Sequence, residues 1–212
     1  MNKYLEALRI VTDCGGKDYV SPKKLDKTTD VNAMIELYQT STKGMTLFQS
    51  EIDELGKSNN MITVYHNSVL DGTRRRIRKY YWAELRNEKY LSIPESISVF
   101  AEVGEDGKPR YRVSVEIDER NATAAQMQRH NSILECPLKS GCEYALSRKA
   151  AGELIFVKDN SKAKQLVSQD GYNKVQICVS IPYDQVEKNN NIGAVIDEAI
   201  KTLTPVYLYT VK

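Results

Sequence analysis

The sequence predicts an α+β fold, in which a small helical unit precedes a domain with a mainly antiparallel sheet. The clearest evidence is residues 96–119, where apolar and polar residues alternate on both sides of the turn sequence GEDGKP. A period of two indicates two half-buried strands. Asp106-Gly107 tolerates positive φ and Pro109 cannot continue a strand ladder, so the two strands should fold back as a hairpin.

The second observation is the order of the other segments along the chain. Amphipathic helical segments come first, and short strands with two helices follow the hairpin. We therefore predict two parts: residues 1–90 as a helical unit carrying a basic segment, and residues 91–212 as an α+β domain built on the hairpin. An isolated hairpin is marginal in water, so the rest of the second part should cover its apolar face.

Three short helices are predicted near the N-terminus. Residues 3–12 place Tyr4, Leu5, Leu8 and Val11 on one helical face. Asp30 is a plausible cap for a second helix, which Gly44 should break. A third helix should follow over residues 46–55, because Thr46 and Gln49 have capping-box spacing and Gly56 provides a stop.

Residues 61–65 indicate a strand, and residues 74–82 allow two interpretations. As a strand, residues 74–82 would point alternately to the two faces of a sheet. As a helix capped by Thr73, the segment would align Ile77, Tyr81 and Leu85. Three arginines in the first helical turn would oppose the helix dipole, which favours the strand.

Three short helices followed by two strands joined at Asp71-Gly72 resemble a winged helix, a topology common to many DNA-binding proteins. The resemblance covers residues 3 to about 82 and includes no specific sequence motif. It implies that the helix over residues 46–55 enters the major groove, with Gln49, Ser50 and Asp53 as the candidates for base contacts. The acidic residues of that helix argue against this role, because a helix facing phosphates is usually basic.

The second part should add strands and two helices to the hairpin. The predicted elements are a helix over residues 121–134, strands over 143–147, 153–158 and 174–181, a helix over 192–203 ended by Pro205, and an edge strand over 206–211. Short connections between such strands indicate a largely antiparallel sheet.

The composition of the chain argues against a membrane or a secreted protein. The 212 residues carry a net charge of +2 and are 41% apolar, which is ordinary for a globular protein. No apolar run approaches a membrane span, and residues 1–16 do not have the pattern of a signal peptide. The four irregularly spaced cysteines are expected to be free thiols in a reducing cytoplasm. We therefore expect a cytoplasmic protein with no membrane partner.

The strongest functional signal is the basic-aromatic run, residues 74–82. Its candidate contact residues are Arg74, Arg75, Arg76, Arg78, Lys79, Tyr80 and Trp82. Guanidinium groups suit phosphate oxygens, and aromatic faces stack on bases. The leading hypothesis is therefore a non-enzymatic protein that binds DNA or RNA through this run. The alternative is a solvated strand whose arginines pair with acids and whose aromatic residues belong to the core.

A second hypothesis is a protein-interaction or assembly module. Balanced charge and potentially exposed edge strands would suit a subunit of a larger complex, a homo-oligomer, or a phage or mobile-element protein acting on a host complex. A positive surface at the basic-aromatic run would favour nucleic acid, and dispersed ion pairs would favour assembly.

A third hypothesis is a metal-dependent nuclease. Glu102, Glu116 and Asp118, with Lys108 nearby, resemble part of a PD-(D/E)xK site, in which carboxylates hold Mg²⁺. That family places a lysine two residues after an acid on one strand, whereas Asp118 follows Glu116 here. No zinc-like spacing, phosphate loop or nucleophile motif is present, so no metal or cofactor is expected.

Overall fold

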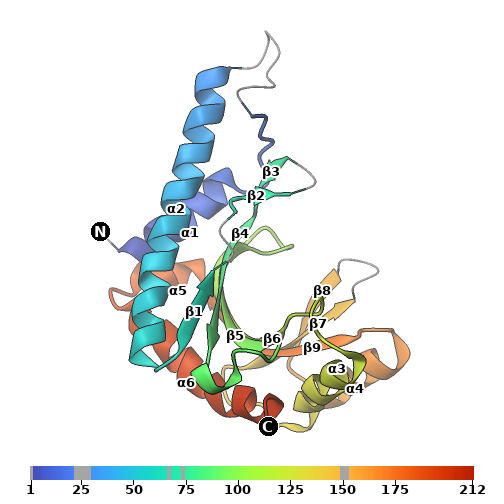
Figure 1. Ribbon diagram of the computed structural model, residues 1–212. Coiled ribbons are helices and arrows are strands. Elements are labelled where there is room, and N and C mark those ends of the chain that lie inside the picture. Colours follow the sequence, from blue (N-terminus) through green and yellow to red (C-terminus); the bar gives the residue numbers. More distant parts are fainter. Residues whose placement is uncertain (1, 22–29, 66–67, 73–74, 149–152) are drawn as a thin grey trace.

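A computed structural model describes residues 2–21, 30–65, 68–72, 75–148 and 153–212. Among these residues, seven strands form one sheet in the order β1-β4-β5-β6-β9-β7-β8, with every neighbouring pair antiparallel (Figure 1). The strands are β1 (Ile62–Tyr65), β4 (Tyr80–Arg86), β5 (Glu95–Val103), β6 (Pro109–Ile117), β7 (Glu143–Arg148), β8 (Glu153–Val157) and β9 (Lys174–Pro182). The predicted α+β class and the hairpin of β5 and β6 are confirmed.

Helices α1, α2, α5 and α6 lie along one face of this curved sheet (Figure 1). Their bounds are α1 (Lys3–Cys14), α2 (Val31–Ser58), α5 (Tyr183–Lys188) and α6 (Ile192–Thr210). The shorter helices α3 (Ala124–Asn131) and α4 (Asn160–Gln169) lie near β7, β8 and β9. The concave face of β4, β5 and β6 opens away from the first group of helices (Figure 1).

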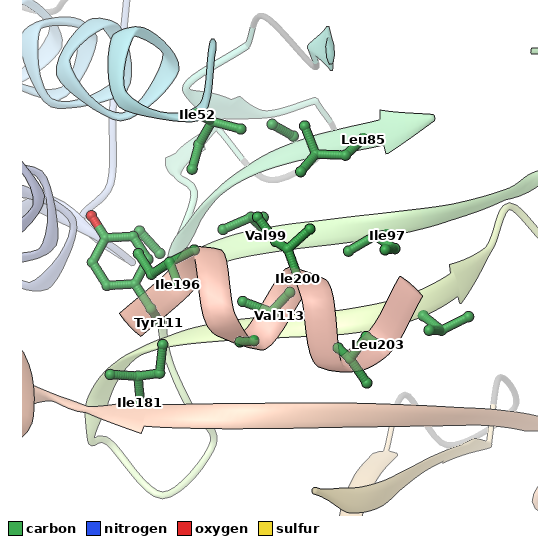
Figure 2. Close-up of a cluster of buried hydrophobic side chains, with 14 of the residues drawn as sticks. Ile52, Leu85, Ile97, Val99, Tyr111, Val113, Ile181, Ile196, Ile200 and Leu203 are labelled. Atoms are coloured by element: carbon green, nitrogen blue, oxygen red, sulfur yellow. The ribbon is translucent and has the colours of Figure 1, made fainter. Parts of the chain in front are cut away.

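The core lies between the sheet and this group of helices. Alternate residues of the strands point toward the helices because side chains alternate along a strand. Val99 and Val113 of the hairpin face Ile196 and Ile200 of α6, and all four are fully buried (Figure 2). Burying a large aliphatic side chain contributes about 1.5–3 kcal/mol, so this layer supplies the cover that the isolated hairpin lacks.

The expected break at Gly44 is wrong, because Val31–Ser58 form the single helix α2. Thr46 is an interior residue whose hydroxyl donates to the Thr42 carbonyl, so it caps no helix. Gly44 lies where α2 packs on its neighbours: a Cβ there would come within 2.6 Å of Ile10 Cγ2 and 2.5 Å of the Tyr81 hydroxyl. The glycine therefore permits close packing, which outweighs its helix-propensity cost of about 1 kcal/mol.

The described residues between 3 and 82 do not have the predicted winged-helix arrangement. The continuous α2 replaces two of its three short helices, and β4 joins a large sheet between β1 and β5. The strand interpretation is confirmed at β3 (Arg76–Ile77) and β4, and the helix interpretation of this segment is wrong. A two-residue strand, β2 (Leu70–Asp71), pairs with β3 in a small hairpin.

Pro205 does not end the C-terminal helix as expected. It lies inside α6, and the edge strand predicted over residues 206–211 does not form. Leu203 and Tyr207 are fully buried on opposite sides of the proline in sequence, so the apolar stripe of the helix continues past it. Packing of that stripe offsets the hydrogen bond that Pro205 cannot donate.

The predicted boundary near residue 90 lies in the connection between the paired strands β4 and β5. The two sides of this boundary are also in contact, since the Tyr111 hydroxyl donates to the main-chain carbonyl of Tyr4 at 2.8 Å. The division into two separately folding parts stays a prediction.

None of the helices in the described ranges is long and apolar enough to cross a membrane. Cys14, Cys136, Cys142 and Cys178 are free thiols, as predicted.

Candidate functional site

The concave face of the sheet carries a row of aromatic side chains. Trp82 on β4 lies directly opposite Phe100 on β5, with ring centroids 5.8 Å apart and ring planes 6° apart. Tyr80 meets Phe100 edge-on, with a centroid distance of 6.4 Å. On the next strand, the Arg112 guanidinium lies 4.0 Å from the centroid of the Phe100 ring. The row therefore joins stacked rings to a cation.

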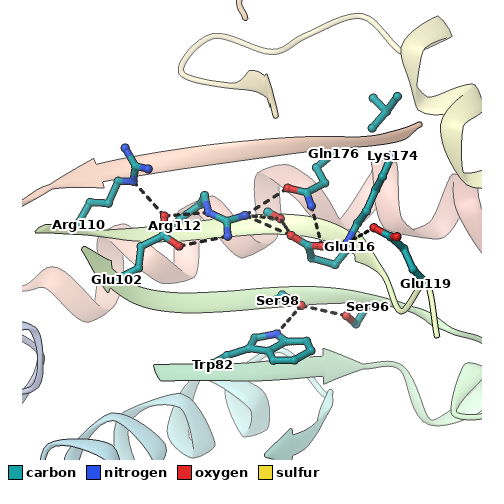
Figure 3. Close-up of polar contacts among 12 residues, drawn as sticks. Trp82, Ser96, Ser98, Glu102, Arg110, Arg112, Glu116, Glu119, Lys174 and Gln176 are labelled. Atoms are coloured by element: carbon teal, nitrogen blue, oxygen red, sulfur yellow. Dashed lines mark hydrogen bonds and ion pairs between the residues drawn. The ribbon is translucent and has the colours of Figure 1, made fainter. Parts of the chain in front are cut away.

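A chain of hydrogen bonds holds the indole of Trp82. Its Nε1 donates to the Ser98 hydroxyl at 3.1 Å, and Ser98 in turn lies 3.1 Å from the Ser96 hydroxyl (Figure 3). Both serines are buried on the same face of β5. An indole with its N–H satisfied and one side against Phe100 is held in a fixed orientation.

Arg112 is the centre of a buried ionic network (Figure 3). Its Nε lies 3.0 Å from Glu102 Oε1 and its Nη2 lies 3.2 Å from Glu102 Oε2, which is a two-point ion pair. Its Nη1 donates to Glu116 at 3.2 Å and to Gln176 at 3.3 Å. Only 4% of Arg112 is exposed, so the carboxylates that surround it are necessary to offset the cost of burying its charge.

The two glutamates of this network are ionised. Burial would raise the pKa of Glu102, but Arg112 and Arg110 overcome that effect and lower it below its usual value. Burial likewise opposes ionisation of Glu116, and Lys174 and Arg112 together lower its pKa. Lys174 Nζ lies 2.6 Å from Glu116 Oε2. The charge of each glutamate in the network is therefore balanced by neighbouring cations.

A cavity of about 430 Å³ lies over this face, and we call it the aromatic cavity. Tyr80, Trp82 and Phe100 contribute its aromatic wall. Its charged lining is balanced between acids and bases: Glu84, Glu116, Asp118 and Glu119, and Arg112, Arg120, Arg148 and Lys174. Several of these charges are neutralised inside the protein, as Glu84 is by Arg86 at 2.6 Å. The cavity thus combines flat apolar surface with little net charge.

The structure divides the basic-aromatic run between two environments. Tyr80 and Trp82 line the aromatic cavity. The preceding cations lie at the β2–β3 hairpin and the start of β4, where Arg75 and Lys79 are exposed. Arg75 has a positive φ of 49°, which places it in a tight turn. Arg74 lies outside the described residues.

Two other cations of the run make local contacts. Arg76 pairs with Asp18 at 2.7 Å while its side chain stays 52% exposed. Arg78 donates to the Leu70 carbonyl at 3.0 Å, and its guanidinium lies 5.8 Å from the centre of the Tyr80 ring. We call Arg75, Arg76, Arg78 and Lys79 the basic border. Of these, Arg78 lies beside the Tyr80 ring, and the Lys79 side chain lies against Gly16, which follows α1.

Gln49 and Ser50 do not join the other predicted contact residues. They lie on α2, whose buried Phe48 packs against Tyr81 on the helix-covered face of β4. Trp82 is the next residue along β4 and points to the opposite face. The sheet therefore separates Gln49 and Ser50 from the aromatic cavity.

The acids of the nuclease hypothesis have other partners. Glu102 binds Arg110 and Arg112, and Asp118 accepts from the Arg120 amide and the Asn121 side chain. Within the described ranges, no group of three or more His, Cys, Asp or Glu residues could hold a metal ion.

Sequence reasoning missed Phe100, Arg112, Lys174 and Gln176 as part of the site. Phe100 and Arg112 stand at the positions that alternate with the apolar residues of their strands. The sequence pattern at these positions predicts only a solvent-facing surface. An arginine and an aromatic residue at such positions are a signal that could have been followed. Lys174 and Gln176 lie on β9, and they come close to Arg112 only because β9 pairs with β6 in the sheet.

Comparison with known proteins identifies no relative: no protein-family model, no curated protein and no solved structure matches this chain.

Proposed function

We propose that this protein binds nucleic acid along the concave face of its sheet. The observation that carries the proposal is that one short segment provides both kinds of contact. Arg75, Arg76 and Lys79 present exposed or partly exposed cations, and Tyr80 and Trp82 turn into the aromatic cavity immediately afterwards. Cations that track a phosphate backbone beside aromatic stacking surfaces are the general features of nucleic-acid binding without sequence preference.

The ion pair between Arg76 and Asp18 is compatible with this role. Asp18 is 76% exposed and the pair is surrounded by solvent, so a phosphate could replace the carboxylate at little cost. Arg112 and Lys174, by contrast, are engaged within the protein and support the cavity wall. Phosphate contacts are therefore assigned to the border and stacking contacts to the cavity.

The test measures binding of fluorescently labelled DNA and RNA, single-stranded and duplex, across a salt series. The double variant Arg76→Ala/Lys79→Ala removes two cations of the border. The double variant Arg9→Ala/Lys57→Ala is the matched control, because Arg9 is 54% exposed in an ion pair with Glu187 and Lys57 is exposed on α2. Both doubles change the net charge equally.

We expect the border double to bind more weakly. Its salt slope on a single strand should fall by roughly 0.7 for each phosphate that the protein no longer neutralises. The control double should behave like the unmodified protein. Absence of binding at low salt would overturn the proposal. Equally weakened binding in both doubles would also overturn it, because it would reflect only net charge.

The edge of the sheet supports a second candidate, a protein-interaction module. Ile62 and Val64 of the edge strand β1 are 40% and 37% exposed, and no described strand pairs with its outer side. An extended peptide could add to such an edge and cover both side chains. Pull-down of a partner by the unmodified protein, abolished in Val64→Lys, would favour this candidate over nucleic acid.

A further inference from the structure

We infer that the protein forms a two-fold dimer, in which the N-terminal half of α2 pairs antiparallel with the same helix of a second copy. The contact surface is the apolar stripe of α2, formed by Val31, Ile35 and Tyr38. This surface includes none of the residues of the basic border or the aromatic cavity, so the inference does not depend on the proposed function.

The apolar stripe is exposed although its side chains are large. Eight large hydrophobic side chains are exposed among the described residues, and three of these are Val31, Ile35 and Tyr38, at 44%, 38% and 41%. Their spacing of four and three residues places them on one side of the helix. Tyr38 touches Tyr19, with ring centroids 5.4 Å apart. The N-terminal turns of α2 project beyond the main sheet (Figure 1), so the sheet does not cover the stripe.

The same part of α2 has a low intrinsic tendency to form a helix. Seven of the twelve residues 31–42 are β-branched, tyrosine, serine or asparagine, which have lower helix propensities than alanine, leucine or glutamate. Most of the stability of a helix in a protein comes from packing of its apolar face. Leu37 packs against the core on one side of α2. A partner on the apolar stripe would supply packing on a second side.

The charges of α2 favour a second copy as the partner. The stripe and its flanking positions, Asn32, Met34, Gln39 and Ser41, carry no charge. Glu36 and Lys43 lie on other sides of the helix by its periodicity, and Lys43 pairs with Glu6 at 2.6 Å. Two copies can therefore meet at the stripe without like-charge repulsion. A strongly acidic or basic partner would find no opposite charge there.

The spacing of the stripe is symmetric about its centre. Thr42 extends it by four residues, and the Thr42 hydroxyl already donates to the Tyr38 carbonyl at 2.9 Å, so it adds no unpaired donor. The steps from Val31 to Thr42 are then four, three and four residues, which is the spacing of a coiled-coil seam.

An antiparallel pair uses this symmetry. Ile35 lies opposite Tyr38 of the second copy, Val31 lies opposite its Thr42, and each contact occurs twice. A two-fold interface requires such a self-complementary surface.

The first test is sedimentation equilibrium of the unmodified full chain. A single helix–helix contact is smaller than a standard interface of about 1,600 Å², so we expect a weak dimer with a dissociation constant on the order of 100 µM or tighter. A monomer at every concentration up to about 300 µM would overturn the inference.

Two variants with the same change in charge test the position of the contact. Ile35→Glu places a carboxylate in the stripe, whereas Ala33→Glu places one at an exposed position on the opposite side of the same helix. We expect Ile35→Glu to weaken dimerisation at least about tenfold and Ala33→Glu to change it by less than about twofold. Equal dimerisation of the two variants would overturn the inference.

A mixing experiment tests the antiparallel register. Tyr38→Lys should also weaken dimerisation, but a mixture of Tyr38→Lys with Ile35→Glu places the new ammonium opposite the new carboxylate and keeps one unmodified contact between Ile35 and Tyr38. We expect the mixture to associate at least about fivefold more tightly than either variant alone. Such recovery would also show that both variants are folded.

Two outcomes of these experiments would contradict the arrangement. Absence of any gain on mixing would overturn the antiparallel pairing. A dimer that is lost in Val64→Lys and retained in Ile35→Glu would place the contact at the β1 edge, and it would overturn the inference as a whole.

Discussion

Arg112 and Glu102 form a two-point ion pair on neighbouring strands, with Nε–Oε1 and Nη2–Oε2 distances of 3.0 and 3.2 Å. The pair lies behind the Phe100 ring on the face that carries the aromatic cavity. It links β5, the second strand of the aromatic row, to β6, and through Glu116 and Gln176 it reaches β9. One buried arginine thus connects three strands of the concave face.

Replacing Arg112 should strongly destabilise the protein. Arg112→Ala leaves buried Glu102 without its main partner and buried Glu116 without one of its two cations, and breaking a buried pair in this way costs about 3–5 kcal/mol. Arg112→Lys should also reduce the stability substantially, because an ammonium cannot reproduce the two-point contact. Urea denaturation measures both. A destabilisation no larger than that of the exposed control Arg9→Ala would contradict the role given to the network.

Stability should depend on pH through His130. This histidine is buried on α3, and its Nε2 donates to the Val175 carbonyl at 2.9 Å. Burial, together with the nearby Lys174, lowers the pKa of His130 from 6.5 to about 4, against the opposing effect of Glu116. The unfolded chain therefore takes up the proton first as the pH falls.

It follows that the contribution of neutral His130 is fully present above pH 6.5 and is lost between pH 6.5 and about 4. At about 1.4 kcal/mol per pH unit, the decrease is roughly 3 kcal/mol. His130→Gln should flatten the unfolding free energy across this window relative to the unmodified protein. An unchanged pH profile in His130→Gln would contradict the prediction.

Gly44→Ala should destabilise the protein, although alanine is the better helix former. The added methyl would collide with Ile10 and the Tyr81 hydroxyl, and overpacking of this kind costs about 1–3 kcal/mol. The matched control is Gly193→Ala in α6, where the nearest atoms, all of the Tyr4 ring and its hydroxyl, are 3.2–3.5 Å away. Thermal unfolding should show a clearly larger destabilisation for Gly44→Ala. Equal stabilities would mean that α2 can shift to accommodate the methyl.

The strands were the most predictable part of this protein. Alternation over residues 96–119 predicted the hairpin, and the apolar phase of residues 174–181 predicted β9. A period of two is a local property of the chain, so it can be recognised without knowing the neighbours. The amphipathic patterns of α1 and α6 could be recognised for the same reason, apart from the continuation of α6 beyond Pro205.

The errors occurred where a distant contact decided the outcome. Gly44 has the local signature of a helix break, yet α1 and β4 pack against it and keep α2 continuous. The basic-aromatic run was recognisable as a unit, but its division into a basic border and an aromatic wall depends on where β4 lies in the sheet. Gln49 was grouped with Trp82 by analogy of topology, and the sheet separates the two.

The sequence by itself determined the α+β class, the principal strands and the chemical character of residues 74–82, because these depend on residue type and short-range spacing. Only the tertiary structure decided which face of the sheet the helices cover. That choice placed the polar side chains of β5, β6 and β9 on one concave surface, where Phe100, Arg112 and Lys174 line the same cavity as Trp82. The physical reason is that burying the apolar phase under α1, α2 and α6 gains free energy, and the opposite phase must then form the open face.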